Sequence, residues 1–168
     1  MAAAAATATA IFELDPRKET DLDAVVEEIV RLEKKIFPKH ESLSKSFHDE
    51  LRKKNSGLMC LKITNGGEGA EIAGYVMYSW ISSLCASITK LAVKENHRRQ
   101  GHGEALLRAA IQKCRTRKIQ RVCLHVDPTR THAVSLYRKL GFQVDELIAH
   151  YYSPERNAYR MYLEFNDD

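Results

Sequence analysis

A short basic, glycine-containing segment offers the clearest chemistry in this sequence. Six consecutive residues, Arg98-Arg99-Gln100-Gly101-His102-Gly103, separate an apolar stretch from a long helical pattern. Glycines allow tight turns and close approach of the backbone to a ligand, and a helix N-terminus offers unpaired N–H groups to an anion. The two arginines add positive charge. The segment therefore predicts a phosphate cradle, with a basic surface turn as the alternative.

The residues on either side of this cradle predict a strand, loop, helix and strand in succession. Residues 86–93 are typical of a strand, residues 104–118 of a helix and residues 121–126 of a second strand. A crossover of this kind makes the two strands parallel and the connection right-handed. The cradle then lies at the carboxyl end of the first strand, where ligands collect in open sheets that contain a parallel pair.

A second set of periodic segments surrounds this unit. A capping-box pattern at Thr20 and Asp23 precedes apolar residues at helical spacing, which predict an amphipathic helix that ends before Phe37-Pro38. Further helices are expected over residues 43–51 and 133–140, and further strands over residues 9–14, 57–63, 72–81, 142–148 and 158–165. The sequence thus predicts an α/β (α+β) domain over residues 9–168, preceded by a flexible alanine-rich tail over residues 1–8.

Composition sets limits on the class of protein. Hydrophobic residues make up 44% and charged residues 29% of the 168, and the net charge is only +4, which describes a globular protein with no strong tendency to bind nucleic acid. No apolar run reaches the roughly 20 residues that cross a bilayer. The four dispersed cysteines predict free buried thiols, as in a protein of the cytosol or nucleus. The sequence contains no Cys/His cluster, so no metal site is predicted.

Two ordered motifs resemble the GNAT N-acetyltransferase superfamily. Arg98-x-x-Gly101-x-Gly103 is similar to its acetyl-CoA signature, Arg/Gln-x-x-Gly-x-Gly/Ala, and residues 133–142 are similar to its Ala-x-x-Leu-Tyr-x-x-x-Gly-Phe segment. The resemblance implies a mixed, mostly antiparallel sheet of about seven strands with a central splayed parallel pair and about four helices. It implies acetyl-CoA (coenzyme A) binding by Leu91, Ala92, Val93, Arg98, Arg99, Gln100, Gly101, His102, Gly103, Glu104 and Tyr137.

Within that superfamily the sequence is most similar to the protein N-terminal acetyltransferases. The segments that carry this likeness are a Phe-Pro loop, a Leu-His-Val strand and a tyrosine-containing C-terminal hairpin, and they imply substrate contacts by Phe37, Pro38, Lys39, Tyr151 and Tyr152. Two departures are visible. Arg130 replaces the usual asparagine before the Ala133 segment, and Lys39 replaces an apolar residue of some eukaryotic members, so their substrate specificity is not transferred.

Acetyl transfer to an amine needs a base and an acid. A protein N-terminus has a pKa of about 7.7 to 8.0 and must lose a proton, and a histidine with an ordinary pKa near 6.5 is suited to accept it. The resemblance assigns this role to His125, and assigns to Tyr137 the donation of a proton or hydrogen bond to the departing thiolate. Without the resemblance, both would be read as structural residues of a strand and a helix.

These residues predict acetyl-CoA-dependent acetylation of protein N-termini by direct attack in a ternary complex. Two alternatives remain, a lysine or small-amine N-acetyltransferase and a catalytically silent acyl-CoA-binding subunit. The expected partner is a protein or peptide N-terminus, with an auxiliary subunit or the ribosome as further candidates. Neither direct reading of nucleic acid nor membrane association is expected.

Overall fold

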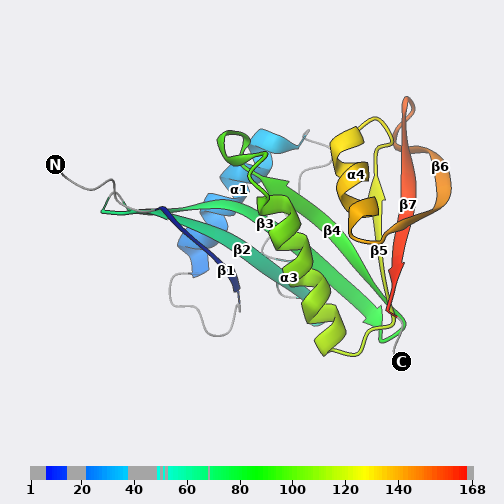
Figure 1. The fold of residues 1–168 in the computed structure, drawn as a ribbon, viewed down its shortest axis with the longest axis horizontal. Coiled ribbons are helices and arrows are strands. Elements are labelled where there is room, and N and C mark those ends of the chain that lie inside the picture. The colour runs from blue at the N-terminus through cyan, green and yellow to red at the C-terminus, as the bar shows by residue number, and fades with distance from the viewer. Residues whose placement is uncertain are drawn as a thin grey trace. The chain divides into compact units, whose positions relative to one another are not determined.

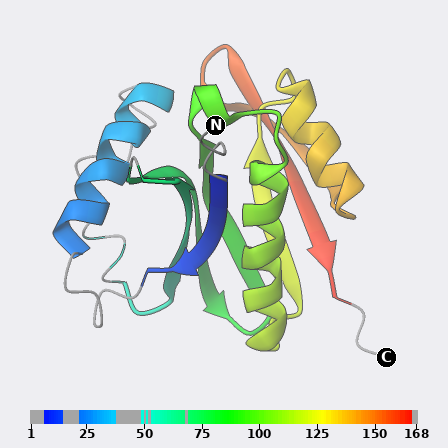
Figure 2. The same cartoon turned by 60° about the vertical axis from the view of Figure 1, so that its left-hand side comes forward.

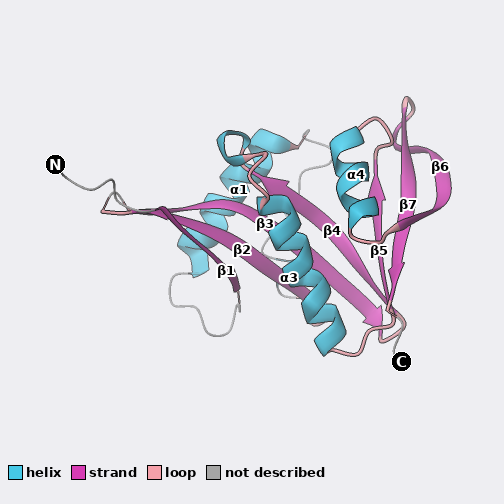
Figure 3. Ribbon diagram, in the orientation of Figure 1, coloured by secondary structure: helices cyan, strands magenta, loops and turns pink. Residues whose placement is uncertain are grey.

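Three α-helices and seven strands make up the regular structure of the described residues (Figures 1 and 3). This computed structural model describes residues 7–14, 22–37, 49, 51, 53–67 and 69–165 of the chain. The strands are β1 (Thr7–Glu13), β2 (Ser56–Asn65), β3 (Ala70–Ser82), β4 (Cys85–Val93), β5 (Arg121–Val126), β6 (Gln143–Ser153) and β7 (Arg156–Glu164). The helices are α1 (Leu22–Ile36), α3 (His102–Thr116), α4 (Thr131–Lys139) and the 3-10 turn η1 (Glu95–His97).

The strands form a seven-stranded sheet in the order β1-β2-β3-β4-β5-β7-β6. β1 and β2 are antiparallel, as are β5 and β7 and the final pair β6 and β7. β4 and β5 are parallel, and their register runs through Ala86↔Val122, Ser87↔Cys123 and Ile88↔Leu124. The predicted mixed, mostly antiparallel sheet with a parallel pair is therefore confirmed.

The contacts within the chain define two compact units. Unit 1 consists of Met1–Met77 and Lys90–Ala110, and unit 2 consists of Tyr78–Thr89 and Ile111–Asp168. The boundaries fall inside β3, β4 and α3, so these three elements contribute residues to both units.

Unit 1 has a core between α1 and the strands β2 and β3. Val26, Ile29 and Leu32 lie at the helical spacing predicted for α1, and they pack in one cluster with β-strand residues such as Leu58 and Tyr75. Figure 2 shows α1 alongside these strands. The apolar stripe thus explains why residues 22–36 form a helix in this protein.

Unit 2 is built on β5, β7 and β6, with α4 beside β5 (Figures 1 and 2). Along β5, the side chains of Val122, Leu124 and Val126 are buried, whereas the alternate residues are more accessible. Successive side chains of a strand point to opposite faces. Arg121, Cys123 and His125 therefore share the more accessible face of β5.

The boundaries of the described elements lie within two residues of the sequence predictions, except at the end of β6. β5 has the predicted bounds, whereas β1 begins at Thr7, α3 begins at His102 and β6 continues to Ser153. Tyr151 and Tyr152 therefore belong to a strand. The predicted helix over residues 43–51 lies outside the described residues except at positions 49 and 51, as does Thr20 of the capping box. In the described part of the chain, no helix is both long enough and apolar enough to span a membrane.

Candidate active site

The cradle predicted from sequence lies in unit 1, between the end of β4 and the start of α3. Arg99 and Gly101 have positive φ values of 63° and 82°, the left-handed backbone that reverses the chain here. The Gly101 carbonyl accepts the first helical hydrogen bond, from the Ala105 N–H at 3.0 Å. The N–H groups that precede Ala105 at the start of α3 therefore have no acceptor within the helix, as an anion site requires.

The two glycines of the cradle have different roles. An added Cβ at Gly101 would meet no atom within 4 Å, so glycine is needed there for its backbone conformation and not for space. Gly103 lies in the first turn of α3 and is not among the residues with positive φ. The sequence predicted a tight turn at both glycines, and of the two only Gly101 has the left-handed backbone of such a turn.

The side chain of Arg98 holds the loop before α3. Its Nε donates to the carbonyl of Val93 at 2.9 Å, which ties the loop to the last residue of β4. The Arg98 side chain therefore helps to fix the conformation of the cradle. The next residue, Arg99, itself has a left-handed backbone, so the two arginines are not structurally equivalent.

A three-residue network braces the same loop against β3. Glu71 accepts from Lys94 Nζ at 2.9 Å, and its other carboxylate oxygen lies 2.6 Å from His97 Nε2. The hydrogen bonds with Lys94 and then His97 are the main causes that lower the pKa of Glu71, against a smaller opposing effect of burial. This network was not predicted from the sequence, because Glu71 lies at the start of β3 whereas Lys94 and His97 follow the end of β4.

The backbone of β4 is held close to β3 at Gly74. A Cβ on Gly74 would lie 2.7 Å from the Ala92 carbonyl oxygen and 3.1 Å from Leu106 Cδ1. A residue with any side chain would displace the end of β4. Gly74 thereby positions the segment Leu91, Ala92 and Val93, whose backbone the resemblance assigns to the cofactor.

The predicted substrate residue Phe37 lies in unit 1, directly after α1. The Lys90 Nζ lies 3.6 Å from the centroid of the Phe37 ring and 3.7 Å from Oε1 of Glu33. The Glu33 side chain is 0% exposed and that of Lys90 is 14% exposed, so both charges are withdrawn from water. Pro38 and Lys39 lie outside the described residues.

Glu33 and Lys90 could have been found from the sequence pattern. Glu33 recurs at helical spacing with Val26 and Ile29, and Lys90 alternates in phase with the buried residues Ile88 and Ala92 of β4. Two opposite charges on apolar faces are a signal for a buried ion pair.

The predicted base His125 lies in unit 2, on the accessible face of β5. Its ring stacks on that of Tyr151, with centroids 4.5 Å apart and an angle of 9° between the planes. Tyr151 in turn meets Tyr152 edge-on at 4.8 Å. Three predicted site residues are therefore brought together in one aromatic cluster.

The electrostatic surroundings of His125 favour its neutral form. Desolvation is the larger cause that lowers the pKa of His125, and the charge of Arg160, its register partner on β7, adds to it. A histidine with a pKa below its ordinary value is largely unprotonated near neutral pH. It is then able to accept a proton, as a base must.

The predicted acid Tyr137 is fixed by the end of α4. Phe142 N–H donates to the Tyr137 carbonyl at 3.0 Å, and Gly141 N–H, with φ of 100°, donates to that of Arg138 at 3.0 Å. This pair of bonds defines a Schellman cap, in which Tyr137 and Phe142 make the accompanying apolar contact, with ring centroids 5.9 Å apart. The cap gives a physical reason for the spacing Tyr-x-x-x-Gly-Phe.

Burial also sets the protonation of Tyr137. The residue is 8% exposed, and desolvation raises the pKa of its phenol, with a smaller opposing effect from Arg130. The hydroxyl is therefore protonated near neutral pH and able to donate a hydrogen bond or a proton. Arg130, the departure noted from the sequence, stands at the N-cap of α4 without a side-chain capping bond.

Asp127 supports the hairpin that carries the tyrosines and was not found from the sequence. Its carboxylate accepts from Thr129 N–H at 2.9 Å, from the Thr129 hydroxyl at 2.7 Å and from Arg156 Nε at 3.1 Å. Burial raises the pKa of Asp127, but these bonds outweigh burial and lower it overall. Arg156 also lies over the Tyr152 ring, 4.8 Å from its centroid. The Asp-Pro turn after β5 is thereby linked to β7.

The predicted site residues thus fall into two groups. Unit 1 holds Phe37, the end of β4 and the cradle, and unit 2 holds His125, Tyr137, Tyr151 and Tyr152. The first group offers anion-binding backbone and guanidinium groups, which fit the phosphates of coenzyme A. The second offers a neutral imidazole, a protonated phenol and an aromatic surface.

A family model described as "Acetyltransferase (GNAT) family" matches residues 23–142, which include both the cradle and the Tyr137 segment. The chain belongs to the GNAT acetyltransferase family. It is 33% identical over 103 residues to an N-alpha-acetyltransferase of Sulfurisphaera tokodaii, covering 54% of this chain and 62% of that protein. The chain spans between 61% and 64% of the length of the first three curated relatives that it matches.

Solved structures agree with this family fold. The ribosomal-protein-S18-alanine N-acetyltransferase of Escherichia coli has a TM-score of 0.78 and 23% identity, over 96% of both chains. Arabidopsis thaliana NAA60, solved in complex with acetyl-CoA, has a TM-score of 0.78 and 17% identity, over 95% of this GNAT chain and 100% of that chain. At these identities the likeness establishes the fold alone.

Proposed function

We propose that this GNAT protein transfers the acetyl group of acetyl-CoA to the α-amino group of protein N-termini. The observation that carries the proposal is the stacking of His125 on Tyr151, which places a neutral imidazole against an aromatic surface on the hairpin. Relatives at 33% and 35% identity that are named N-alpha-acetyltransferase support the choice of acceptor.

In this proposal the cradle binds the phosphates of the donor. Backbone N–H groups at the start of α3 and the positive charge of Arg99 are the groups suited to them, while Arg98 keeps the loop in place through Val93. Acetyl-CoA supplies a thioester whose carbonyl carbon is open to attack by an amine. The backbone of Leu91, Ala92 and Val93 is the proposed support for the donor beyond its phosphates.

His125 and Tyr137 handle the protons in the proposed reaction. His125 accepts the proton of the substrate ammonium, directly or through a water molecule, so that the neutral amine attacks in a ternary complex. Tyr137 donates to the departing sulfur, because its phenol remains protonated near neutral pH. No covalent acetyl-enzyme is required. Phe37, Pro38, Lys39, Tyr151 and Tyr152 are proposed to line the path of the substrate peptide.

The test compares two lysine-containing peptides, one with a free N-terminus and one with a blocked N-terminus, by measuring thiol release from acetyl-CoA. Product from the free peptide at the α-amine supports the proposal. Product only from the blocked peptide, on lysine, contradicts it and favours the lysine acetyltransferase alternative. A lysine amine has a pKa of about 10.4 and demands a stronger base than a neutral histidine provides.

The alternative of a silent acyl-CoA-binding subunit is separated by two variants. His125→Ala and Tyr137→Phe should each lower kcat by about a hundredfold if these residues act as base and acid, with the affinity for coenzyme A preserved. Equal thiol release by the wild type and both variants would remove the mechanism. An auxiliary subunit or the ribosome is a proposed partner, and adding the purified partner to the assay would test it.

A further inference from the structure

The accessible face of β5 holds a second chemical feature, separate from the proposed acetyl transfer. Cys123 on β5 and Cys85 at the start of β4 have their Sγ atoms 3.1 Å apart, and both are free cysteines. A disulfide needs sulfur atoms about 2.05 Å apart, so a movement of roughly 1 Å closes the bond. The remaining cysteines, Cys60 and Cys114, are fully buried.

The strand register explains why these two thiols meet. Cys123 is paired with Ser87, and Cys85 lies two residues before Ser87 on the same strand. Side chains two residues apart on a strand share a face, so Cys85 is the diagonal neighbour of Cys123 across the parallel pair. The contact is therefore set by the sheet and does not depend on a flexible loop.

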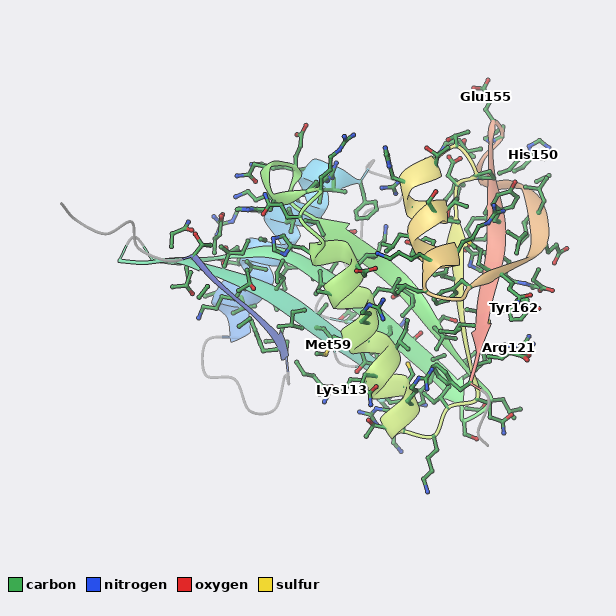
Figure 4. All side chains as sticks on the ribbon, viewed as in Figure 1. Met59, Lys113, Arg121, His150, Glu155 and Tyr162 are labelled. Atoms are coloured by element: carbon green, nitrogen blue, oxygen red, sulfur yellow. The ribbon has the colours of Figure 1, made fainter. Side chains whose placement is uncertain are left out.

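Small reagents have access to the pair. A cavity of about 440 Å³ is lined by both cysteines together with Arg121, Arg160 and Tyr162. The Arg121 guanidinium lies over the Tyr162 ring at 4.5 Å, and Figure 4 shows these two side chains next to each other. Both cysteines are only half-buried, unlike Cys60 and Cys114.

Burial and the neighbouring thiol dominate the electrostatics of Cys123. Desolvation and the bond to Cys85 raise the pKa of Cys123 to about 12, against smaller opposing effects of Arg121 and Arg160. Cys123 therefore keeps its proton near neutral pH and can donate it to the sulfur of Cys85. Because its pKa is raised, Cys123 is a poor first nucleophile toward a peroxide, so the first attack is assigned to Cys85, and Cys123, with its sulfur 3.1 Å away, is positioned to resolve the product.

We propose that Cys85 and Cys123 form a two-cysteine oxidation site that a hydroperoxide converts to a reversible disulfide between β4 and β5. In the first step the sulfur of Cys85 attacks one peroxide oxygen, giving Cys85 sulfenic acid and, from hydrogen peroxide, one water molecule. In the second step the sulfur of Cys123 attacks that of Cys85, forming the S–S bond and releasing a second water molecule. The two thiols lose two electrons, and hydrogen peroxide accepts them.

The site lies close to the proposed base. Cys123 is two residues before His125 on the same face of β5, and Arg160 both lines the cavity and is paired with His125. Closing the bond draws the first residue of β4 toward β5, because diagonal neighbours lie farther apart than residues directly opposite. Formation of the disulfide is nonetheless independent of acetyl transfer, so the two proposals can fail separately.

The test treats the folded, full-length protein with hydrogen peroxide in slight molar excess and maps the products by peptide mass spectrometry. The expected result is one peptide that joins Cys85 to Cys123, the loss of two titratable thiols and full reversal by dithiothreitol. In Cys123→Ser, Cys85 should instead gain oxygen, because its resolving partner is absent. A cross-link from Cys85 to Cys114, or unmodified Cys85 when other thiols have reacted, would overturn the proposal.

A second probe tests the same thiol pair in the folded wild type, so that the result does not depend on the folding of a variant. Phenylarsine oxide bridges two close thiols with loss of one water molecule, so the wild type should bind one equivalent under native conditions. Cys85→Ser and Cys123→Ser, checked by circular dichroism, should each lose stable binding. Cys60→Ser should retain it. Undiminished binding by a folded Cys85→Ser variant would show that the pair is not the site.

Discussion

At the scale of single residues, burial and, to a smaller extent, the charge of Arg160 lower the pKa of the proposed base, His125. Arg160 lowers the pKa of His125 and is held by Asp145 through two bonds of 3.0 and 2.7 Å. A lowered pKa means that kcat falls only when the pH drops below the ordinary histidine value of 6.5. Arg160→Gln removes this charge and should raise the pKa of His125, so the acidic limb of the kcat profile should move to higher pH. Thiol release measured from about pH 5 to about pH 8, the range in which histidines titrate, checks this shift.

Arg121 provides a matched control for this shift. Arg121 lies on the same face of β5 as His125. Its side chain is 40% exposed, against 43% for Arg160, and it is bonded to the carboxylate of Glu164 on β7. Its charge is not among the causes of the His125 shift. Arg121→Gln should leave the acidic limb unchanged. If both variants moved it equally, or neither did, His125 would not be the group that titrates.

The ion pair between Lys90 and Glu33 makes a prediction about stability. Lys90→Met removes the cation beside a carboxylate that is 0% exposed, and breaking a buried pair on one side costs about 3 kcal/mol. Urea unfolding should show this loss in the free energy of unfolding. The double variant Lys90→Met with Glu33→Gln should recover much of it, because no buried charge is then left. A single variant as stable as the wild type would contradict the burial of the pair.

At the scale of elements, the end of α4 connects backbone geometry to chemistry. Gly141 has φ of +100°, and a Cβ there would lie 3.1 Å from Leu163 Cδ1. Gly141→Ala should cost about 1–2 kcal/mol and displace Tyr137, whose carbonyl receives the capping bond. The midpoint temperature of thermal unfolding (Tm) and kcat should therefore both decrease.

Gly67 is the matched control for Gly141. Its φ is +96°, with no atom within 4 Å of an added Cβ, and it lies in the turn between β2 and β3. Gly67→Ala should lose comparable stability through backbone strain alone, with kcat unchanged. A similar fall of kcat in both variants would show that general destabilisation, and not the position of Tyr137, controls the rate.

The same elements show how much the sequence could predict. The helix α1 and the strand β5 follow from apolar periodicity, and Gly141 marks the end of α4. A strand was predicted over residues 142–148, and its continuation to Ser153 was not, because the residues of β6 are mostly exposed and no apolar alternation marks the strand. Contacts such as Glu71 with His97, or Asp127 with Arg156, depend on tertiary pairing that periodicity does not encode.

At the scale of the whole molecule, family membership joins features that are far apart in the sequence. The match over residues 23–142 includes the cradle and the Tyr137 segment, which neither composition nor net charge would have connected. The Tyr151 hairpin lies beyond that match, and its role was inferred from similarity to N-terminal acetyltransferases. The cradle indicates the acetyl donor, whereas the acceptor depends on His125 and the tyrosines.

Binding of coenzyme A should stabilise the whole fold by mass action. At a concentration a hundredfold above Kd, a ligand that binds only the folded chain adds about 2.7 kcal/mol to the free energy of unfolding. Gly101→Ala strains the left-handed turn of the cradle without a steric clash, because the space around its Cβ is open. If its Kd rises tenfold, the gain at the same concentration falls by about 1.3 kcal/mol.

Unfolding in urea with and without coenzyme A measures this difference directly. Gly67→Ala should keep the full gain although its own stability is lower, and Gly101→Asn should lie between Gly101→Ala and the wild type, since asparagine tolerates the left-handed backbone better than alanine. No gain in the wild type would mean that the cradle does not bind coenzyme A. An equal gain in all four proteins would place its binding site away from Gly101.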